Sequence, residues 1–311
     1  MVKQFSAFAP ATISNVACGF DVFGFAIDGP GDIVTARFSD KPGITISAIS
    51  GDEGRLPLKT MSNTAGIAAN HLMNTIKSAV GIDLQITKKM PFSSGLGSSA
   101  ASAAAAVTAI NALLDYPLKH EELLPSVVEA ERALCGSSHA DNAAPALLGG
   151  FILVRSTEPL DYIKVPLPEN LHYALVHPKI EINTNDARKA LPKQIDLFTA
   201  VKQWANTAAL VQALNSSDFG LLGRSMVDYV AEPVRAKMVS HYQEVKETAL
   251  ANGAVAFTIS GSGPAMFAFS DNADKAEKIA TAMNAVYNKY DIENTVYSGK
   301  IKHDGTTLIR E

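Results

Sequence analysis

The residues with the clearest chemical potential form a run of small side chains, Pro91–Ala101, with the sequence PFSSGLGSSAA. Gly95 and Gly97 allow a tight turn and let the backbone approach a ligand with no Cβ in the way. Ser98 and Ser99 follow where a helix would begin, so they can cap its free N–H groups or offer hydroxyls to a ligand. Amides and the positive end of a helix dipole converge at such a turn, which predicts an anion site. The expected ligand of this site is a phosphate group.

Two common nucleotide motifs do not fit this loop. A P-loop requires a lysine directly after its second glycine, and no lysine follows Gly97. The dinucleotide fingerprint in its G-x-G-x-x-A form does match Gly95, Gly97 and Ala100, and Asp115 follows at about the usual distance of 20 residues. Asp115, however, closes the helix itself, and no second strand precedes it to bring an acid to a ribose.

A carboxylate on an apolar helix face is a second chemical signal. The helix expected over 121–135 carries an apolar stripe that includes Val127 and Leu134, and Glu131 falls in the middle of it. An ionised carboxylate on a buried face is costly unless a cation pairs with it. From the helix alone, a salt bridge and a metal site are equally good explanations. A phosphate loop nearby favours the metal, because Mg²⁺ at nucleotide phosphates uses one or two carboxylates.

Further polar residues are embedded in apolar sequence. Asn15 and Asp21 lie in a glycine-containing segment that fits neither a regular element nor a solvated loop, and local turn chemistry would explain them by itself. His139, Asp141 and Asn142 fall within four residues, which favours a site over a lone structural histidine.

The elements that must position these residues follow from periodicity and turn signals. Two early strands, Ile33–Phe38 and Ile44–Ile49, are expected to pair, and Trp204 is expected in the core. A hairpin is expected around the turn 261–264. The other expected strands are Lys3–Ala9, Leu84–Thr87, Phe151–Val154, Tyr173–Val176, Ala254–Ser260, Ala265–Phe269 and Thr295–Ser298. The expected helices are Asn63–Val80, Ser102–Leu114, Glu121–Cys135, Phe198–Asn215, Phe219–Val230, Val234–Asn252 and Ala273–Tyr290.

Composition narrows the class of protein. The 311 residues are 47% hydrophobic and 19% charged, which suits one large or two ordinary domains. A net charge of −4 gives no broad basic surface for nucleic acid, and no apolar run is long enough for a membrane span. Cys18 and Cys135 lie far apart, which fits a reducing compartment without structural zinc. We therefore expect a soluble cytoplasmic protein, α+β in its C-terminal half.

Three stretches in order resemble the GHMP kinases. They are the loop Pro91–Ala100, the segment Glu131–Asn142 and the late glycine turn Gly261–Pro264. This resemblance implies an α+β fold of two domains. An N-terminal ATP-binding domain, ribosomal-protein-S5-like, would span 1–165, and a ferredoxin-like C-terminal domain would span 166–311.

Within that family the chain is most similar to the members that phosphorylate L-homoserine. The similarity rests on Ala9–Asn15 with Gly19–Gly24, on His139–Ala146, on Asn183–Arg188 and on Glu232–Arg235. Val16-Ala17-Cys18 departs from the usual pattern, but Asn15 and Asp21 keep their spacing. The implied reaction is ATP-dependent phosphorylation of the side-chain hydroxyl to O-phospho-L-homoserine, in threonine biosynthesis. The alternatives are a mevalonate-type GHMP kinase and a non-catalytic binding protein on this fold.

The resemblance assigns one side of the site to the amino acid. Asn15 and Asp21 should hold the ammonium group, and Arg188 and Arg235 should clamp the carboxylate with their planar donor forks. Two downstream arginines make turn chemistry alone a poor explanation for Asn15 and Asp21.

The same resemblance implies the residues around the reacting hydroxyl. His139 and Asn142 should line the site, with Asn142 nearest the hydroxyl, and Thr184 and Gly261 should complete its wall. Asp141 matches the position of a catalytic aspartate in mevalonate kinases. Our hypothesis is that Asp141 here is structural or electrostatic and that no dedicated base is needed.

On the nucleotide side, the resemblance implies ATP and Mg²⁺ as cofactors, and it suggests a homodimer. Ser98 or Ser99, with Glu131, should position the metal. Asn63 and Thr64 match the adenine-contact region more weakly. The ATP phosphates should lie on the loop formed by Pro91, Phe92, Ser93, Ser94, Gly95, Leu96, Gly97, Ser98, Ser99, Ala100 and Ala101.

Overall fold

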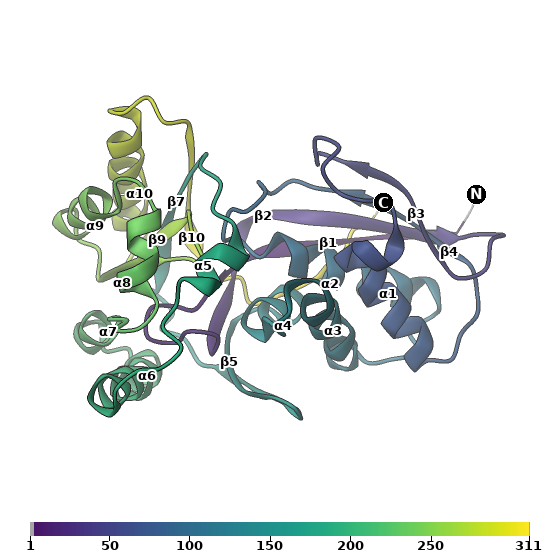
Figure 1. Ribbon diagram of the computed structural model, residues 1–311, viewed down its shortest axis with the longest axis horizontal. Coiled ribbons are helices and arrows are strands. Elements are labelled where there is room, and N and C mark those ends of the chain that lie inside the picture. The colour runs from purple at the N-terminus through teal and green to yellow at the C-terminus, as the bar shows by residue number, and fades with distance from the viewer. Residues whose placement is uncertain (1–2, 311) are drawn as a thin grey trace.

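The computed structural model describes residues 3–310, which form two β-sheets, each covered by helices (Figure 1). The larger sheet has seven strands in the order β11-β1-β2-β4-β3, with β5 paired to β2 and β6 to β5. Its strands are β1 (Gln4–Ser14), β2 (Phe23–Phe38), β3 (Ile44–Ser50), β4 (Ile82–Thr87), β5 (Phe151–Thr157), β6 (Leu160–Val165) and β11 (Thr307–Leu308).

Helix α2 (Ser98–Leu113) is the centre of the first half. Every residue from Ala100 to Leu113 is buried, because small side chains let the neighbouring backbones approach closely. It packs on β1 and β2, and the other helices pack around it on the same side of the sheet (Figure 1). The helix predicted over Ser102–Leu114 is confirmed, and it begins four residues earlier. The surrounding helices are α1 (Thr64–Thr75), α3 (Leu124–Cys135) and α4 (Ala140–Leu148).

The smaller sheet is antiparallel, in the order β10-β7-β9-β8, and α10 packs against it. The predicted hairpin around the late glycine turn is confirmed, because β8 pairs with β9. The strands are β7 (His172–Pro178), β8 (Ala256–Ile259), β9 (Met266–Ser270) and β10 (Asn294–Lys300). The helices are α5 (Thr184–Lys189), α6 (Leu197–Ser216), α7 (Phe219–Ser225), α8 (Glu232–Arg235), α9 (Tyr242–Ala251) and α10 (Ala273–Asn288).

The end of the chain returns to the first sheet. Thr307–Leu308 pairs with β1, and Ile301 forms a bridge to Ile27. The division at 165/166 remains a prediction, and the last described residues pack with the N-terminal half. None of the helices within residues 3–310 combines the length and apolarity that a membrane span requires.

Two predictions about the first strands are wrong. Strand β1 continues past Pro10 to Ser14, because Pro10 lies at a register shift, where a missing N–H is tolerated. Strands β2 and β3 do not pair, because β4 lies between them. Helix α1 connects β3 to β4, and such a crossover makes these two strands parallel.

Two predictions about the C-terminal helices are also wrong. The helix expected over Val234–Asn252 is broken between Arg235 and Tyr242, and His241 there has a left-handed φ of 60°. Trp204, expected in the core, is 56% exposed. Its helix, α6, buries only Leu210 and two further residues near its end.

Candidate active site

One cavity of about 350 Å³ brings together segments from both halves of the chain. Its walls come from the loop ahead of α2, from α3 and α4, and from the segment between β1 and β2. The C-terminal half contributes α5, α8 and the turn between β8 and β9. The pocket therefore lies where the two sheets' elements meet.

The loop ahead of α2 needs its glycines. Gly97 has a φ of +66°, and a Cβ there would lie 1.9 Å from Thr12 Oγ1 and 2.8 Å from Asn142 Oδ1. Gly95 has a φ of +75°, and its Cβ would lie 2.5 Å from the carbonyl oxygen of Ser260. Both positions combine a left-handed backbone with a close neighbour, so only glycine fits.

The late glycine turn holds this loop from the other half of the molecule. Ser260 Oγ donates to the carbonyl oxygen of Gly95 at 2.5 Å. The amide of Ala265 donates to the carbonyl of Ser94, and the amide of Gly261 donates to the carbonyl of Ser14. These bonds tie the C-terminal half to both N-terminal segments that form the cavity.

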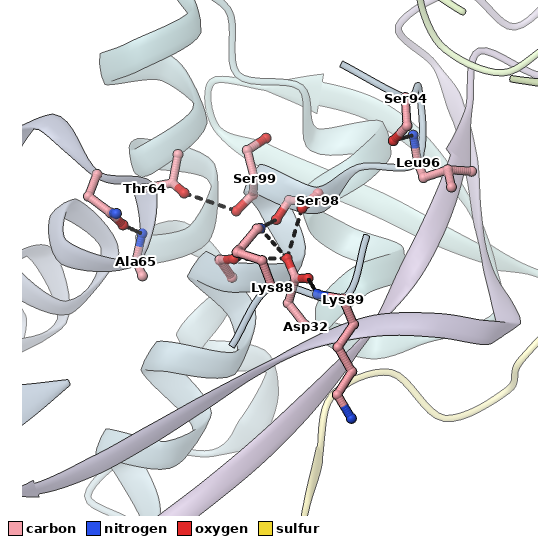
Figure 2. A network of polar contacts seen from close by, with 11 residues as sticks. Asp32, Thr64, Ala65, Lys88, Lys89, Ser94, Leu96, Ser98 and Ser99 are labelled. Carbon is pink, nitrogen blue, oxygen red and sulfur yellow. Dashed lines mark hydrogen bonds and ion pairs between the residues drawn. The ribbon is translucent and has the colours of Figure 1, made fainter. Parts of the chain in front are cut away.

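A buried ion pair lies beneath the start of α2 (Figure 2). Asp32 of β2 is fully buried and pairs with Lys88, which directly follows β4. Ser98 Oγ donates to Asp32 at 2.8 Å, and Ser102 Oγ donates to the same carboxylate at 3.0 Å. Lys88 also donates to the carbonyl of Ser98, and the amide of Lys89 donates to Asp32. The network fixes the first turn of the helix that faces the cavity.

Sequence reasoning missed Asp32 and Lys88. Lys88 lines the cavity beside the loop, so this chain places a lysine near the predicted phosphate site from the preceding strand. Burial lowers the pKa of Lys88, and the Asp32 carboxylate opposes that shift. The available signal was an acid directly ahead of the apolar stretch at Ile33, together with a lysine pair directly after β4.

Glu131 is buried on α3, with only 2% of its surface exposed, and it lines the cavity. Its Oε2 atom lies 3.2 Å from His139 Nδ1. Leu134, placed on the same apolar stripe from sequence, is 42% exposed, because it stands at the cavity mouth instead of in the core.

The segment between β1 and β2 presents Asn15 and Asp21 to the cavity. Both have left-handed backbones, with φ values of 70° and 56°. Asn15 Oδ1 accepts from the Asp21 amide at 3.0 Å, and Asn15 Nδ2 donates to the carbonyl of Gly261 at 3.0 Å. The Asn15 side chain therefore has two roles: it stabilises the local turn and it links this segment to the C-terminal half of the chain.

The two arginines expected to clamp a carboxylate lie close together. Arg188 forms an ion pair with Asp21, at 2.5 Å from Nη2 to Oδ2, and also donates to Ser137 Oγ. Arg235 is 4% exposed and donates through Nη1 to the carbonyl of Gly261 at 2.8 Å. Both guanidinium groups lie over the ring of Phe20, at 5.6 and 5.1 Å from its centroid.

Arg235 keeps unused binding capacity. Among the described residues, its Nε atom is buried without a hydrogen-bond partner. Burial lowers the pKa of Arg235, whereas the nearby Asp21 carboxylate raises it. A buried donor without a partner at the cavity wall is suited to an anionic group of a ligand.

Asp141 and Asn142 lie in the first turn of α4. Asp141 is buried, and no described residue hydrogen-bonds to its Oδ1. Burial, reinforced by the negative charge of Asp21, raises the pKa of Asp141 to about 7. Asn142 Oδ1 accepts from Thr12 Oγ1 at 2.8 Å, so the amide N–H₂ group is the donor that remains for a ligand.

Most residues predicted for the site line this one cavity. Ala100 and Ala101 do not, because they are buried in α2. Asn63 caps α1 through the amide of Ala65, and Thr64 Oγ1 donates to the carbonyl of Ser99. The lining residues predicted from sequence are Asn15, Asp21, Asn63, Thr64, Pro91, Phe92, Ser93, Ser94, Gly95, Leu96, Gly97, Ser98, Ser99, Glu131, His139, Asp141, Asn142, Thr184, Arg188, Arg235 and Gly261.

The fold and the glycine loop define a class of small-molecule kinase, and comparison with known proteins agrees. The model of the GHMP kinases N terminal domain matches residues 63–150, and that of the GHMP kinases C terminal matches 210–289. The chain belongs to the GHMP kinase family. The expected two-domain α+β fold is thereby confirmed.

Particular relatives carry a more specific name. The homoserine kinase of Chloroherpeton thalassium is 47% identical, over 99% of this chain and all of the relative. The homoserine kinase of Xanthomonas campestris pv. campestris is 36% identical, over 99% and 95% of the two chains. The crystal structure of homoserine kinase from Cytophaga hutchinsonii superposes with a TM-score of 0.97 at 48% identity, covering 99% of this chain and 98% of that one.

Proposed function

We propose that this chain transfers the γ-phosphoryl group of ATP to the side-chain hydroxyl of L-homoserine, with O-phospho-L-homoserine and ADP as products. The relatives that support this proposal span nearly the whole chain and are named homoserine kinases. The product places the reaction in amino-acid biosynthesis, on the way to threonine.

The observation that carries the proposal is the pairing of opposite charges at one end of the cavity. Asp21 and Arg188 form an ion pair there, and Arg235 lies beside them with an Nε atom to which no described residue hydrogen-bonds. A zwitterion brings one ammonium and one carboxylate, so it can replace the Asp21–Arg188 pair without leaving either charge unpaired. An alcohol with only one charge would pair with either Asp21 or Arg188 and leave the second of these partly buried charges unpaired, which is costly.

ATP phosphates are proposed to lie on the amides of the loop 91–101 at the other end of the cavity. The family implies Mg²⁺, and the donor set fits it. Ser98 gives its hydroxyl hydrogen to Asp32, which leaves oxygen lone pairs for a cation, and Glu131 supplies a buried carboxylate. We assign the metal to Ser98 or Ser99 with Glu131, where a bound cation would neutralise charge on the phosphates. Asn63 and Thr64 are assigned to the adenine side.

Phosphoryl transfer depends mainly on positioning and charge neutralisation. Asn142, held by Thr12, is proposed to orient the attacking hydroxyl with its amide N–H₂ group. His139 and Thr184 line the same space, as does Lys88, whose charge is paired with Asp32. Asp141 is proposed to act electrostatically, although a pKa near 7 also suits a general base. Mutation of Asp141 separates these two roles.

A substrate panel tests the proposal directly. ADP release by the purified chain with Mg²⁺ and ATP is measured with L-homoserine, L-serine, mevalonate and galactose in parallel. We expect turnover with L-homoserine to exceed that with the others by orders of magnitude. Turnover with mevalonate instead would identify a mevalonate-type kinase. ATP binding without turnover of any of them would favour a non-catalytic binding protein.

A further inference from the structure

Helix α8 brings Arg235 to the cavity wall, yet this helix is a single turn of four residues, Glu232–Arg235. A helix of this length is not stable through its own backbone bonds, so contacts with the rest of the fold must hold it. The direction in which Arg235 presents its guanidinium group therefore depends on what fixes α8.

The carboxylate of Glu232 fixes α8 to two elements of the C-terminal half. Its side chain is 12% exposed, and its Oε1 atom lies 2.9 Å from Nζ of Lys246 on α9. The hydroxyl of Tyr242, also on α9, donates to the same oxygen. Thr258 Oγ1 of β8 donates to the other oxygen, Oε2, at 2.5 Å. Burial and the neighbouring charge of Glu232 raise the pKa of Tyr242, so its hydroxyl keeps the proton that it donates.

Glu232 and Arg235 are connected to the same stretch of chain. They lie three positions apart, and therefore on the same side of a helical turn. Glu232 accepts from Thr258, and Arg235 Nη1 donates to the carbonyl oxygen of Gly261, three residues further along. One connection would let the short helix pivot. Two connections, at its first and last residues, fix both its position and its rotation.

The chain that enters α8 is fixed separately, by Asp228. This residue is 8% exposed, and its carboxylate accepts from the backbone amides of Val230, Ala231 and Glu232. These bonds hold the backbone ahead of the helix and do not reach α9 or β8. The side chain of Glu232 is thus the contact that ties the turn carrying Arg235 to the sheet and to α9.

Glu232 acts on the cavity only through its neighbour in α8. Of the described residues, those that line the cavity include Arg235 but not Glu232. We propose that Glu232 is a positioning residue, which holds α8 so that the donors of Arg235 meet the carboxylate of the substrate in the correct geometry. The inference rests on the proposed function, which assigns Arg235 to the carboxylate of L-homoserine.

A double-mutant cycle tests the proposal. Glu232→Gln keeps the shape of the side chain and removes the charge that its donors share. We expect kcat/KM for L-homoserine to fall about 10–100-fold, mainly through KM, with the KM for ATP nearly unchanged. In a chain that already carries Arg235→Met, Glu232→Gln should lower kcat/KM by less than about threefold more, because the group that it positions is gone. Additive effects would overturn the proposal.

Glu244→Gln is the matched control for this cycle. Glu244, on α9, accepts from Lys289 and Tyr290, so it has a lysine and a tyrosine as partners, as Glu232 does, but its bonds do not reach α8. Its kinetic constants should equal those of the wild type. A rise in the KM for L-homoserine as large as that of Glu232→Gln would show a general effect on the C-terminal half and would contradict positioning by Glu232.

A second variant keeps the proposal testable if Glu232→Gln fails to fold. Thr258→Val removes only the bond from β8 to the Glu232 carboxylate, and it should raise the KM for L-homoserine about 3–10-fold. An unchanged KM would overturn the proposal. Wild-type activity separates the two levels of inference. A wild type without L-homoserine turnover would refute the proposed function and this inference with it, whereas an active wild type and unaffected variants would refute this inference alone.

Discussion

The two ends of the cavity hold their charges in different ways. At the glycine-loop end, Asp32 and Lys88 are buried and are hydrogen-bonded to Ser98 at the start of α2. At the proposed amino-acid end, Asp21 and Arg188 are each about one-third exposed and form an ion pair with one another. We expect the first pair, which is part of the fold, to stay in place when a ligand binds. Under the proposed function, a zwitterionic substrate replaces the second pair.

This difference predicts which property each substitution changes. Loss of a buried partner leaves an uncompensated charge in the core, so it should lower the free energy of unfolding. Loss of a partner that is one-third exposed leaves a charge that water can still reach, so it should change substrate binding and leave the fold intact.

The largest effect is expected for Lys88→Met. It strands Asp32 and removes the bond to Ser98, so the free energy of unfolding should fall by about 3–5 kcal/mol and kinase activity should be lost. Urea unfolding and ADP release measure the two effects. Lys275→Met, which removes an exposed pair with Asp271, is the matched control and should change unfolding by less than about 1 kcal/mol. Equal effects of the two would remove the distinction between buried and exposed pairs.

Arg188→Met should act on one substrate only. We expect kcat/KM for L-homoserine to fall about 10²–10³-fold, because a charge-assisted contact with the carboxylate is lost. The KM for ATP and the melting temperature should stay near their original values. Arg155→Met, a distant exposed arginine paired with Asp161, is the control. A comparable rise in the KM for ATP would show that the two ends of the cavity are not separate.

Asp141→Asn tests an electrostatic role against a base. We expect kcat to fall less than about 10²-fold, whereas a loss of about 10⁴-fold or more with normal substrate binding would identify a general base. A base would also make wild-type kcat/KM rise through pH 7 and the variant lose that rise.

The same variant has a second readout in stability. The folded pKa of Asp141, about 7, lies above its ordinary value of 3.8, so the folded state binds the proton more tightly. Stability from this group is therefore present below about pH 4 and is lost as pH rises through 7. The Asn side chain of Asp141→Asn does not ionise, so the variant does not lose this stability as pH rises. Its stability relative to wild type should increase by about 2–3 kcal/mol between pH 5 and pH 8, measured by denaturant unfolding. A gain independent of pH would contradict the raised pKa.

The smallest effect is expected for Thr184→Val. The Thr184 hydroxyl lies 3.3 Å from Ser262 Oγ at the cavity wall, and its loss removes one neutral hydrogen bond. The KM for L-homoserine should rise by less than about tenfold, with kcat for saturating substrate nearly unchanged. Thr199→Val on the outer start of α6 serves as the control. A loss as large as that for Arg188→Met would mean that Thr184 contacts the transferred group.

Local sequence patterns predicted many of the helices and strands. The small residues of α2, the alternation in β4 and the glycine turn between β8 and β9 each encode their element within a few residues. Glu131 was identified because a carboxylate interrupted an apolar helix face, and it is buried. The wrong predictions arose where residues distant in sequence decide which strands pair. Strand β4 lies between β2 and β3 in the sheet, and the sequence periodicity within β2 and β3 gives no sign of the strand between them.

The sequence by itself determined the glycine loop ahead of α2, since Gly95 and Gly97 allow a tight turn and the small residues after them suit the start of a buried helix. It also named Asp21, Arg188 and Arg235 through motif resemblance. Only the tertiary structure decided that Asp32 and Lys88 lie beneath that loop, and that Asp21 and Arg188 form an ion pair. The partners in these two pairs are separated by 56 and 167 residues. Folding alone brings them together. Asp32 and Lys88 continue the antiparallel register of β2 and β4, in which Ile33 pairs with Thr87, and Asp21 and Arg188 come from opposite halves of the chain.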